Sequence, residues 1–205
     1  RAVSSATRAT AARVRHQRFG GSAVRQFTTR LAVALVLGAF CVRDSGVARA
    51  VPLEASTREA PEIVGIEHWI NSVPLSIAAL RGKVIVVNFW TFDCENCQHT
   101  LSHLVQWYED YKDRGLVIIG IHTPEFPHER GRAETEAAVH EHGIRYPVAQ
   151  DNKSATWKAY GNRYWPAFYF IDAHGVIRYE RFGEGGYDES EAVIRELLAE
   201  AKGAP

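Results

Sequence analysis

The chain has 205 residues, of which 46% are hydrophobic and 11% aromatic, so it is long enough and apolar enough for one domain with a packed core. Its formal net charge of zero hides a difference between two parts. Residues 1–50 hold nine of the 24 basic residues and one of the 24 acidic residues, which leaves residues 51–205 with a net charge of −8. Because an acidic surface repels phosphate backbones, we expect no nucleic-acid partner for the folded part.

Residues 1–50 are typical of a targeting segment. An apolar run over residues 31–42 follows an arginine-rich stretch, and its twelve residues are too few to span a bilayer but suit the hydrophobic region of a signal peptide. Ala48 and Ala50 stand at the two positions that a signal peptidase reads, which predicts cleavage before Val51. We therefore expect an exported protein of the periplasm or cell envelope.

Other interpretations of this segment stay open. Residues 1–30 are rich in Arg, Ser and Thr and lack acidic residues, which is also typical of an organellar transit peptide. An uncleaved apolar run would instead tether the protein to the membrane. Beyond this segment, we interpret residues 51–61 as a linker and residues 62–205 as the folded domain.

The first half of the domain predicts two buried strands around a helix. Short apolar stretches over residues 63–80 predict an N-terminal hairpin or strand pair. A continuous β-branched and aromatic run over residues 84–90 predicts a central strand that is buried on both faces. A helix is expected over residues 94–112, since its apolar residues recur three and four apart, and a second buried strand over residues 116–121. A strand, helix and strand at this spacing form a βαβ unit with parallel strands.

The second half predicts shorter elements. In chain order they are a helix over 133–142, a short strand over 146–149, a short helix over 154–160, strands over 167–171 and 176–182, and a helix over 189–202. The four residues 172–175 make the last two strands a hairpin. These elements together predict an α/β fold in which a mixed sheet lies between layers of helices.

Two cysteines carry the clearest chemical signal. Because Cys41 lies in the predicted signal peptide, the mature chain would keep only Cys94 and Cys97. Cys94 follows a buried strand and opens a helix, where free peptide N–H groups and the helix dipole stabilise a thiolate. Cys97 lies one turn further on the same side, so the two sulfurs can form and break a disulfide. We predict a redox pair in which Cys94 attacks and Cys97 resolves.

Residues 84–97, which contain this pair, resemble the active-site strand and loop of the thioredoxin superfamily, especially its exported TlpA/ResA-like redoxins. Residues 115–126, 160–167 and 182–187 resemble parts of the thioredoxin-like domain of DipZ-type proteins. The resemblance covers roughly residues 62–200. It implies a thioredoxin-like three-layer sandwich and thiol–disulfide oxidoreductase activity without a cofactor or a bound metal.

The resemblance also implies roles for residues outside the cysteine pair. Pro166 matches the cis-proline that faces the dithiol in this superfamily, and Trp165 would present the backbone that pairs with an extended substrate. Trp90 would line the site. Glu95, which follows the attacking cysteine, is predicted to contact the substrate as well.

The sequence departs from the family pattern at two positions. Asn88 and Thr100 stand where relatives carry the acidic residues that deprotonate the second thiol. Glu125 is therefore a hypothetical proton acceptor, and water or an ordinary solvated role for this carboxylate stay open. Asp93 and Glu95 oppose the helix dipole at Cys94, which predicts a fairly reducing couple, nearer to thioredoxin than to strong oxidases.

The expected partners are client proteins that carry disulfides, including apocytochrome c and other oxidised exported proteins. DipZ-type proteins carry a membrane electron conduit that this chain lacks, so we expect a separate membrane electron-transfer protein to re-reduce it. We expect the protein itself to be a monomer.

Two alternative functions stay open. His99 and His103 follow the cysteine pair at helical spacing, as a thioredoxin-fold copper chaperone could require. Thr91 stands three residues before Cys94, as in peroxiredoxins, although Val87 occupies the position of their upstream proline. The second alternative is therefore a thiol peroxidase.

Overall fold

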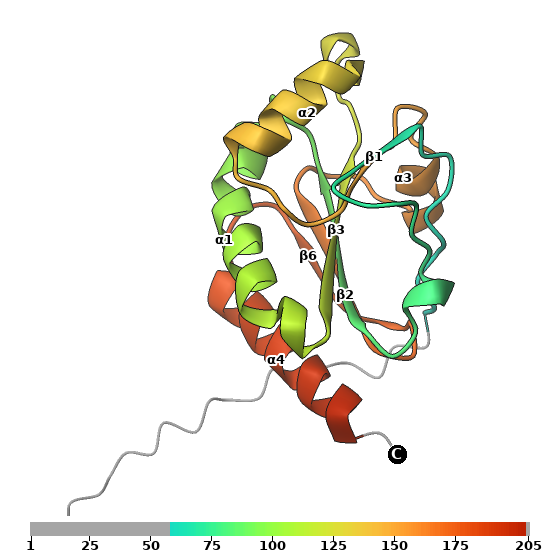
Figure 1. Ribbon diagram of the computed structural model, residues 1–205, viewed down its shortest axis with the longest axis vertical. Coiled ribbons are helices and arrows are strands. Elements are labelled where there is room, and N and C mark those ends of the chain that lie inside the picture. Colours follow the sequence, from blue (N-terminus) through green and yellow to red (C-terminus); the bar gives the residue numbers. More distant parts are fainter. Residues whose placement is uncertain (1–57, 204–205) are drawn as a thin grey trace, which may run out of the picture. The chain divides into compact units, whose positions relative to one another are not determined.

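The computed structural model describes residues 58–203, in which one six-stranded sheet is covered by helices on both faces (Figure 1). The predicted targeting segment and residues 51–57 of the predicted linker lie outside the described residues. The strands are β1 (His68–Ile70), β2 (Val84–Trp90), β3 (Leu116–His122), β4 (Val148–Gln150), β5 (Ala167–Ile171) and β6 (Ile177–Phe182). The helices are α1 (Glu95–Tyr111), α2 (Arg132–Glu141), α3 (Ala155–Tyr160) and α4 (Tyr187–Gly203), with short 3-10 helices η1 (Ala78–Leu80), η2 (Lys112–Arg114) and η3 (Pro127–Arg130).

The strands lie in the order β1-β4-β3-β2-β5-β6. Strands β2, β3 and β4 are parallel, whereas β5 and β6 form an antiparallel hairpin beside β2. The predicted mixed sheet, its βαβ unit and its hairpin are therefore confirmed. The register pairs Trp90 with His122, so the carboxyl ends of β2 and β3 lie together at one edge of the sheet.

The predicted N-terminal hairpin is wrong. Within residues 63–80 the structure has one strand, β1, which pairs with the distant β4. The chain turns away after Ile70 because Asn71 adopts a left-handed conformation, with φ of 63°. The Asn71 side chain donates hydrogen bonds to the carbonyl groups of Ile144 and Tyr146, which fixes this turn beside β4.

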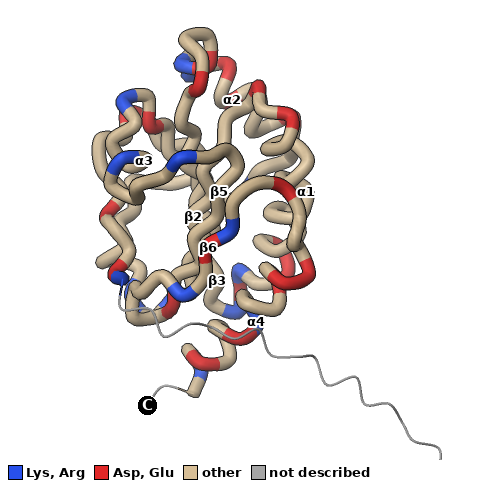
Figure 2. Tube along the Cα trace, turned by 180° about the vertical axis from the view of Figure 1, so that it is seen from behind, with Lys and Arg blue, Asp and Glu red and all other residues tan. Residues whose placement is uncertain are grey.

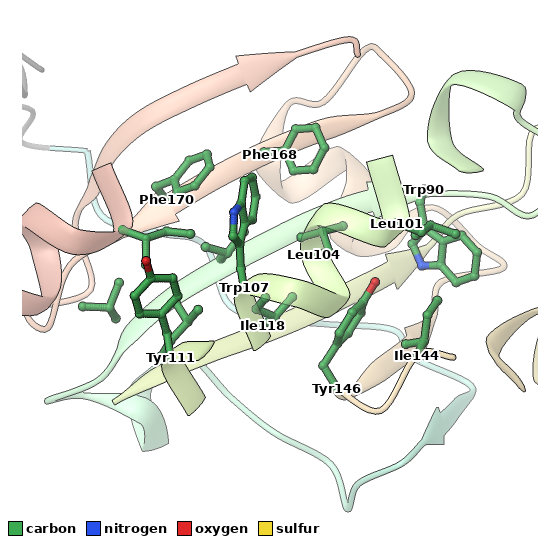
Figure 3. Close-up of a cluster of buried hydrophobic side chains, with 14 of the residues drawn as sticks. Trp90, Leu101, Leu104, Trp107, Tyr111, Ile118, Ile144, Tyr146, Phe168 and Phe170 are labelled. Atoms are coloured by element: carbon green, nitrogen blue, oxygen red, sulfur yellow. The ribbon is translucent and has the colours of Figure 1, made fainter. Parts of the chain in front are cut away.

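Strand β2 separates two hydrophobic clusters, because successive side chains of a strand point to opposite faces. Val84, Val86 and Trp90 pack under α1, α2 and α4, the face that Figure 3 shows. Ile85, Val87 and Phe89 pack on the other face with residues of α3 and η1. In Figure 2, β2 and β5 carry no charged residue, while the acidic and basic residues lie on helices, loops and outer strands. The cysteine loop thus follows a strand that is fixed from both sides.

Helix α1 confirms the predicted helix after this strand. Cys94 is its N-cap, with the extended backbone angles φ −102° and ψ 106°. After η2 the chain leaves through Gly115, whose φ of 106° favours glycine, and enters β3. No helix within residues 58–203 is long and apolar enough to cross a membrane.

Candidate active site

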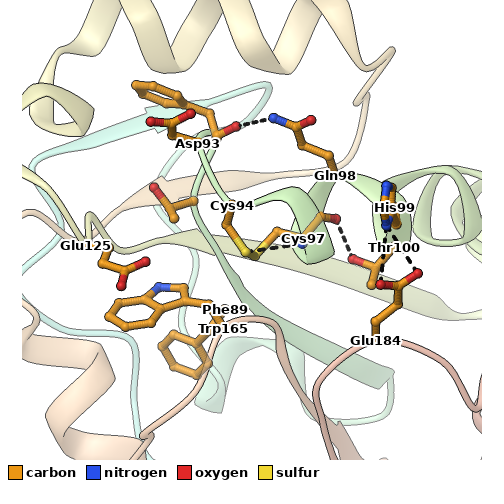
Figure 4. The surroundings of a disulfide bond; sticks show 12 residues. Phe89, Asp93, Cys94, Cys97, Gln98, His99, Thr100, Glu125, Trp165 and Glu184 are labelled. Carbon is orange, nitrogen blue, oxygen red and sulfur yellow. Dashed lines mark hydrogen bonds and ion pairs between the residues drawn. A yellow bond between two sulfur atoms is a disulfide. The ribbon is translucent and has the colours of Figure 1, made fainter.

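Cys94 and Cys97 form a disulfide at the start of α1, with 5.2 Å between their Cα atoms (Figure 4). Cys94 is half-buried, whereas Cys97 has no exposed surface. The Cys97 peptide N–H lies 3.2 Å from Cys94 Sγ and donates to it. A thiolate on Cys94 would keep this donor and gain the favourable field of the helix N-terminus. Only Cys94 is accessible to an incoming disulfide, as the predicted division of roles requires.

The peptide bond between Trp165 and Pro166 is cis, as the resemblance implies. The Trp165 ring is held in place, since its Nε1–H donates to the Thr123 carbonyl at 3.0 Å and its ring lies 4.0 Å from that of Trp157. In Figure 4, Trp165 and Glu125 lie on one side of the disulfide, and the pair of His99 and Glu184 lies on the other. Three chain segments that are distant from one another in sequence thus border the cysteines.

Trp90 does not line this site, contrary to the prediction. Its side chain is fully buried, and its ring lies edge-on to that of His122 with 5.2 Å between the centroids. The reason is strand alternation, which turns Trp90 to the same face as Val84 and Val86, under α1. A side chain without exposed surface cannot contact a substrate in this state.

The two predicted carboxylates lie at the surface. Glu95 is exposed in the first turn of α1. Glu125 is exposed on the loop between β3 and η3, and Figure 4 shows its carboxylate beside Trp165. Asp93, also exposed, forms an ion pair with His128, with 3.0 Å between Oδ2 and Nε2. Its negative charge is therefore partly offset when His128 is protonated.

A buried carboxylate that the sequence analysis missed lies behind the cysteine loop. Glu129 has no exposed surface and accepts four hydrogen bonds. One oxygen accepts from the Thr91 hydroxyl at 2.5 Å and from the Asp93 peptide N–H at 3.3 Å. The other accepts from the peptide N–H groups of Glu125 and Phe126 at 2.6 and 2.7 Å. Glu125 lies on the loop before η3, whereas Glu129 is the third residue of η3 and accepts from the peptide N–H of the N-cap Phe126. Pro127 followed by Glu129 at the third position is the local signal that could have identified this helix start.

His122 completes this buried group of polar side chains. Its Nε2 lies 3.3 Å from Thr91 Oγ1, and its ring stacks on Phe92 with 5.4 Å between the centroids. Burial lowers the pKa of His122 to about 4, although the nearby charge of Glu129 acts in the opposite direction. The imidazole is therefore neutral near neutral pH.

The histidines behind the metal alternative have other partners. His99 Nδ1 lies 3.2 Å from the Glu184 carboxylate, and His103 stacks on Tyr187 with 3.6 Å between the ring centroids. Within the described range, 58–203, no three His, Cys, Asp or Glu side chains are grouped so that they could hold a metal ion. Thr91, which suggested a peroxidase, is buried and donates its hydroxyl hydrogen to Glu129.

Comparisons with known proteins agree with this geometry. The chain matches the AhpC/TSA family over residues 57–180. It is 47% identical over 146 residues to protein DipZ of Mycobacterium tuberculosis, a match that covers 70% of this chain but only 21% of DipZ. It is 25% identical over 142 residues to the thiol-disulfide oxidoreductase YkuV of Bacillus subtilis, covering 69% of this chain and 95% of YkuV.

A solved structure extends the comparison to three dimensions. The crystal structure of a thioredoxin-like superfamily protein superposes with a TM-score of 0.66 at 31% identity, covering 72% of this chain and 99% of that one. The two chains therefore share the thioredoxin-like fold. The family match spans more than half of the sequence, and the chain therefore belongs to the AhpC/TSA family, with a thioredoxin-like fold.

Proposed function

We propose that the protein is an exported thiol–disulfide oxidoreductase that reduces disulfides in client proteins. The observation that carries this proposal is the Cys94–Cys97 pair at the first turn of α1, with Cys94 accessible and Cys97 buried. YkuV, which matches over nearly its whole length, is named for the same chemistry. The DipZ match extends over only a fifth of DipZ, so the activity of that larger protein supports the proposal only in part.

The reaction is two successive thiol–disulfide exchanges. In the reduced protein the Cys94 thiolate attacks one sulfur of the client disulfide, which forms a mixed disulfide and releases the other client sulfur as a thiolate. The Cys97 thiolate then attacks Cys94 Sγ, which releases the second client thiolate and leaves the disulfide seen in the structure. Two electrons pass to the client, and the client thiolates take up the two protons that the cysteines lose.

Residues around the disulfide supply the remaining roles in this proposal. The backbone at Trp165 and Pro166 pairs with an extended client segment, and Glu95 contacts the client from the first turn of α1. Glu125, which is exposed beside Trp165, is the proposed proton acceptor for the Cys97 thiol. A membrane electron-transfer protein re-reduces the monomeric enzyme after each cycle, and apocytochrome c is among its clients.

The direction of electron flow follows from the charges near Cys94. Asp93, Glu95 and Glu125 are all acidic and exposed around the helix N-terminus. Negative charges oppose a thiolate and therefore make the dithiol form less stable than it is in strong oxidases. We expect a reduction potential near that of thioredoxin, about −270 mV.

The test is the reduction potential of the full chain, measured by equilibration with glutathione and dithiothreitol followed by thiol labelling. A value above about −150 mV would make the protein a disulfide donor instead. Two single variants then test the division of roles. Cys97→Ser should accumulate the mixed disulfide with a disulfide-containing client, whereas Cys94→Ser should form none. Failure of the wild type to form the intramolecular disulfide would reject the proposed function.

A further inference from the structure

We propose that Glu129 is a positioning residue for the Cys94–Cys97 couple: it holds the peptide before Cys94 and, through its buried negative charge, favours the disulfide over the dithiol. This inference rests on the proposed thiol–disulfide function. It assigns a task to a fully buried group of polar side chains, Thr91, His122 and Glu129, that borders the cysteine loop.

The charge of Glu129 follows from its four neighbours. Three of them are peptide N–H groups, those of Asp93, Glu125 and Phe126, and a peptide N–H can only donate. The fourth is the Thr91 hydroxyl, 2.5 Å away. Four donors saturate the two oxygens of an ionised carboxylate, whereas a protonated carboxyl group would face these donors with a hydrogen of its own. Glu129 is therefore a buried anion with every acceptor position filled.

The hydrogen bonds beyond Glu129 have a fixed direction. Because Thr91 gives its hydroxyl hydrogen to Glu129, its oxygen accepts from the Nε2–H of His122. His122 then carries its hydrogen on Nε2 and has a bare Nδ1, and among the described residues that Nδ1 has no hydrogen-bond partner. The order of donors is thus His122 to Thr91 to Glu129.

This group is tied directly to the residue before the attacking cysteine. The Asp93 peptide N–H binds Glu129, so covalent geometry alone places the carboxylate within about 12 Å of Cys94 Sγ. The same short segment is held twice more, by the ion pair between Asp93 and His128 and by the stacking of Phe92 on His122. A substitution at Glu129 therefore alters the backbone at Asp93, which is bonded directly to Cys94.

The position of the charge decides how strongly it acts. Asp93, Glu95, Glu125 and His128 also face the cysteine loop, but all four are exposed, so water and salt screen them. Glu129 lies in the interior, where screening is weak. Its negative charge opposes the Cys94 thiolate, destabilises the dithiol form and thereby makes the protein a better reductant.

The experiment compares the full wild-type chain with Glu129→Gln, which keeps the shape of the side chain and removes its charge. Glu134→Gln, an exposed carboxylate on α2, is the matched control. Two quantities are measured: the equilibrium constant with glutathione, and the Cys94 pKa from the pH dependence of its alkylation by iodoacetamide. In Glu129→Gln we expect the equilibrium to move about threefold or more toward the dithiol and the Cys94 pKa to fall by about half a unit or more. Glu134→Gln should match the wild type.

Two further measurements separate charge from structure. Glu129→Asp keeps the anion with altered hydrogen bonds, so its equilibrium constant should lie closer to the wild type than that of Glu129→Gln. In the wild-type protein, the NMR chemical shifts of the His122 ring nitrogens should show the Nε2–H tautomer. This measurement does not depend on whether any variant folds.

The possible failures are distinct. A wild type that never equilibrates with glutathione rejects the proposed function. A wild type that equilibrates normally while folded Glu129→Gln keeps its equilibrium constant and alkylation profile overturns the role of Glu129. An Nδ1–H tautomer of His122 also overturns it, because Thr91 would then donate to His122 and could not donate to Glu129.

Discussion

Two of the segments that border the disulfide are tied to it in different ways. The inner segment, residues 123–130 after β3, holds the cysteine loop through the buried carboxylate of Glu129. The outer segment, residues 183–186 after β6, contacts α1 through His99 and Glu184, whose side chains are 53% and 40% exposed. Buried and fully satisfied hydrogen bonds are costly to break and insensitive to salt, whereas exposed ion pairs contribute little and are screened. The inner segment is therefore built to hold the site in one geometry.

The outer segment has a firmer connection through its backbone. Gly183 donates its peptide N–H to the carbonyl of Pro166 at 2.8 Å, and its φ of 79° favours glycine. Gly186 has a φ of 66°, which also favours glycine, and an added Cβ would lie 2.5 Å from the guanidinium carbon of Arg181. Gly183 thus connects this segment to the cis-proline through the backbone, while the side-chain pair of His99 and Glu184 adds a weak link.

The largest expected loss of stability comes from a substitution that removes the hydrogen bonds of the inner segment. Replacing Glu129 with Ala leaves one buried and three part-buried donors without the buried carboxylate that they share, so we expect the free energy of unfolding to fall by about 4 kcal/mol. Urea unfolding of the oxidised protein measures this loss. Glu134→Ala at the exposed surface of α2 should change stability by no more than about 0.5 kcal/mol. A loss below about 1 kcal/mol in Glu129→Ala would mean that water replaces the carboxylate.

The next effect concerns pH. The folded-state pKa of His122 is lowered to about 4 by burial, below its unfolded value of 6.5, so the unfolded state binds a proton first as the pH falls. Neutral His122 therefore stabilises the folded state above about pH 6.5. Between about pH 6.5 and pH 4 the free energy of unfolding falls progressively, by about 2 to 3 kcal/mol. Urea unfolding at both ends of this range gives the wild-type loss, and His122→Gln should show a correspondingly smaller loss. Equal losses in the two proteins would assign the pH dependence to other groups.

A smaller effect tests the hydroxyl between His122 and Glu129. Thr91→Val keeps the shape of the side chain but removes one hydrogen bond to Glu129 and the acceptor for His122. We expect a loss of about 1.5 kcal/mol in the free energy of unfolding, with recovery of most of it in Thr91→Ser. If the Val and Ser variants were equally stable, the hydroxyl would contribute nothing and the packing of the methyl group would decide.

The smallest expected loss of stability comes from a substitution in the outer segment. Glu184→Gln removes the ion pair with His99, which we expect to be worth about 0.5 kcal/mol or less and to vanish at high salt. Unfolding in low and high salt measures both values. A salt-independent loss comparable to that of Thr91→Val would contradict the distinction between the two segments.

Sequence reasoning succeeded where the signal was local. The apolar runs of β2 and β3 and the apolar spacing of α1 predicted the βαβ unit, and the turn at residues 172–175 predicted the hairpin. The cysteine spacing at a helix start predicted the disulfide, and the cis peptide bond at Pro166 followed from family resemblance. Strand alternation could also have predicted that Trp90 is buried, since it shares the face of Val84 and Val86.

The sequence by itself therefore determined the order of elements, the sheet around β2 and the redox pair, because these depend on short-range periodicity and spacing. Only the tertiary structure decided which carboxylate of the loop after β3 is buried. Glu125 and Glu129 are only four residues apart, yet the first is exposed and the second is surrounded by donors from two segments. The contact of Glu129 with Thr91 and Asp93 joins segments that are more than 30 residues apart, and no short-range pattern in the sequence specifies it.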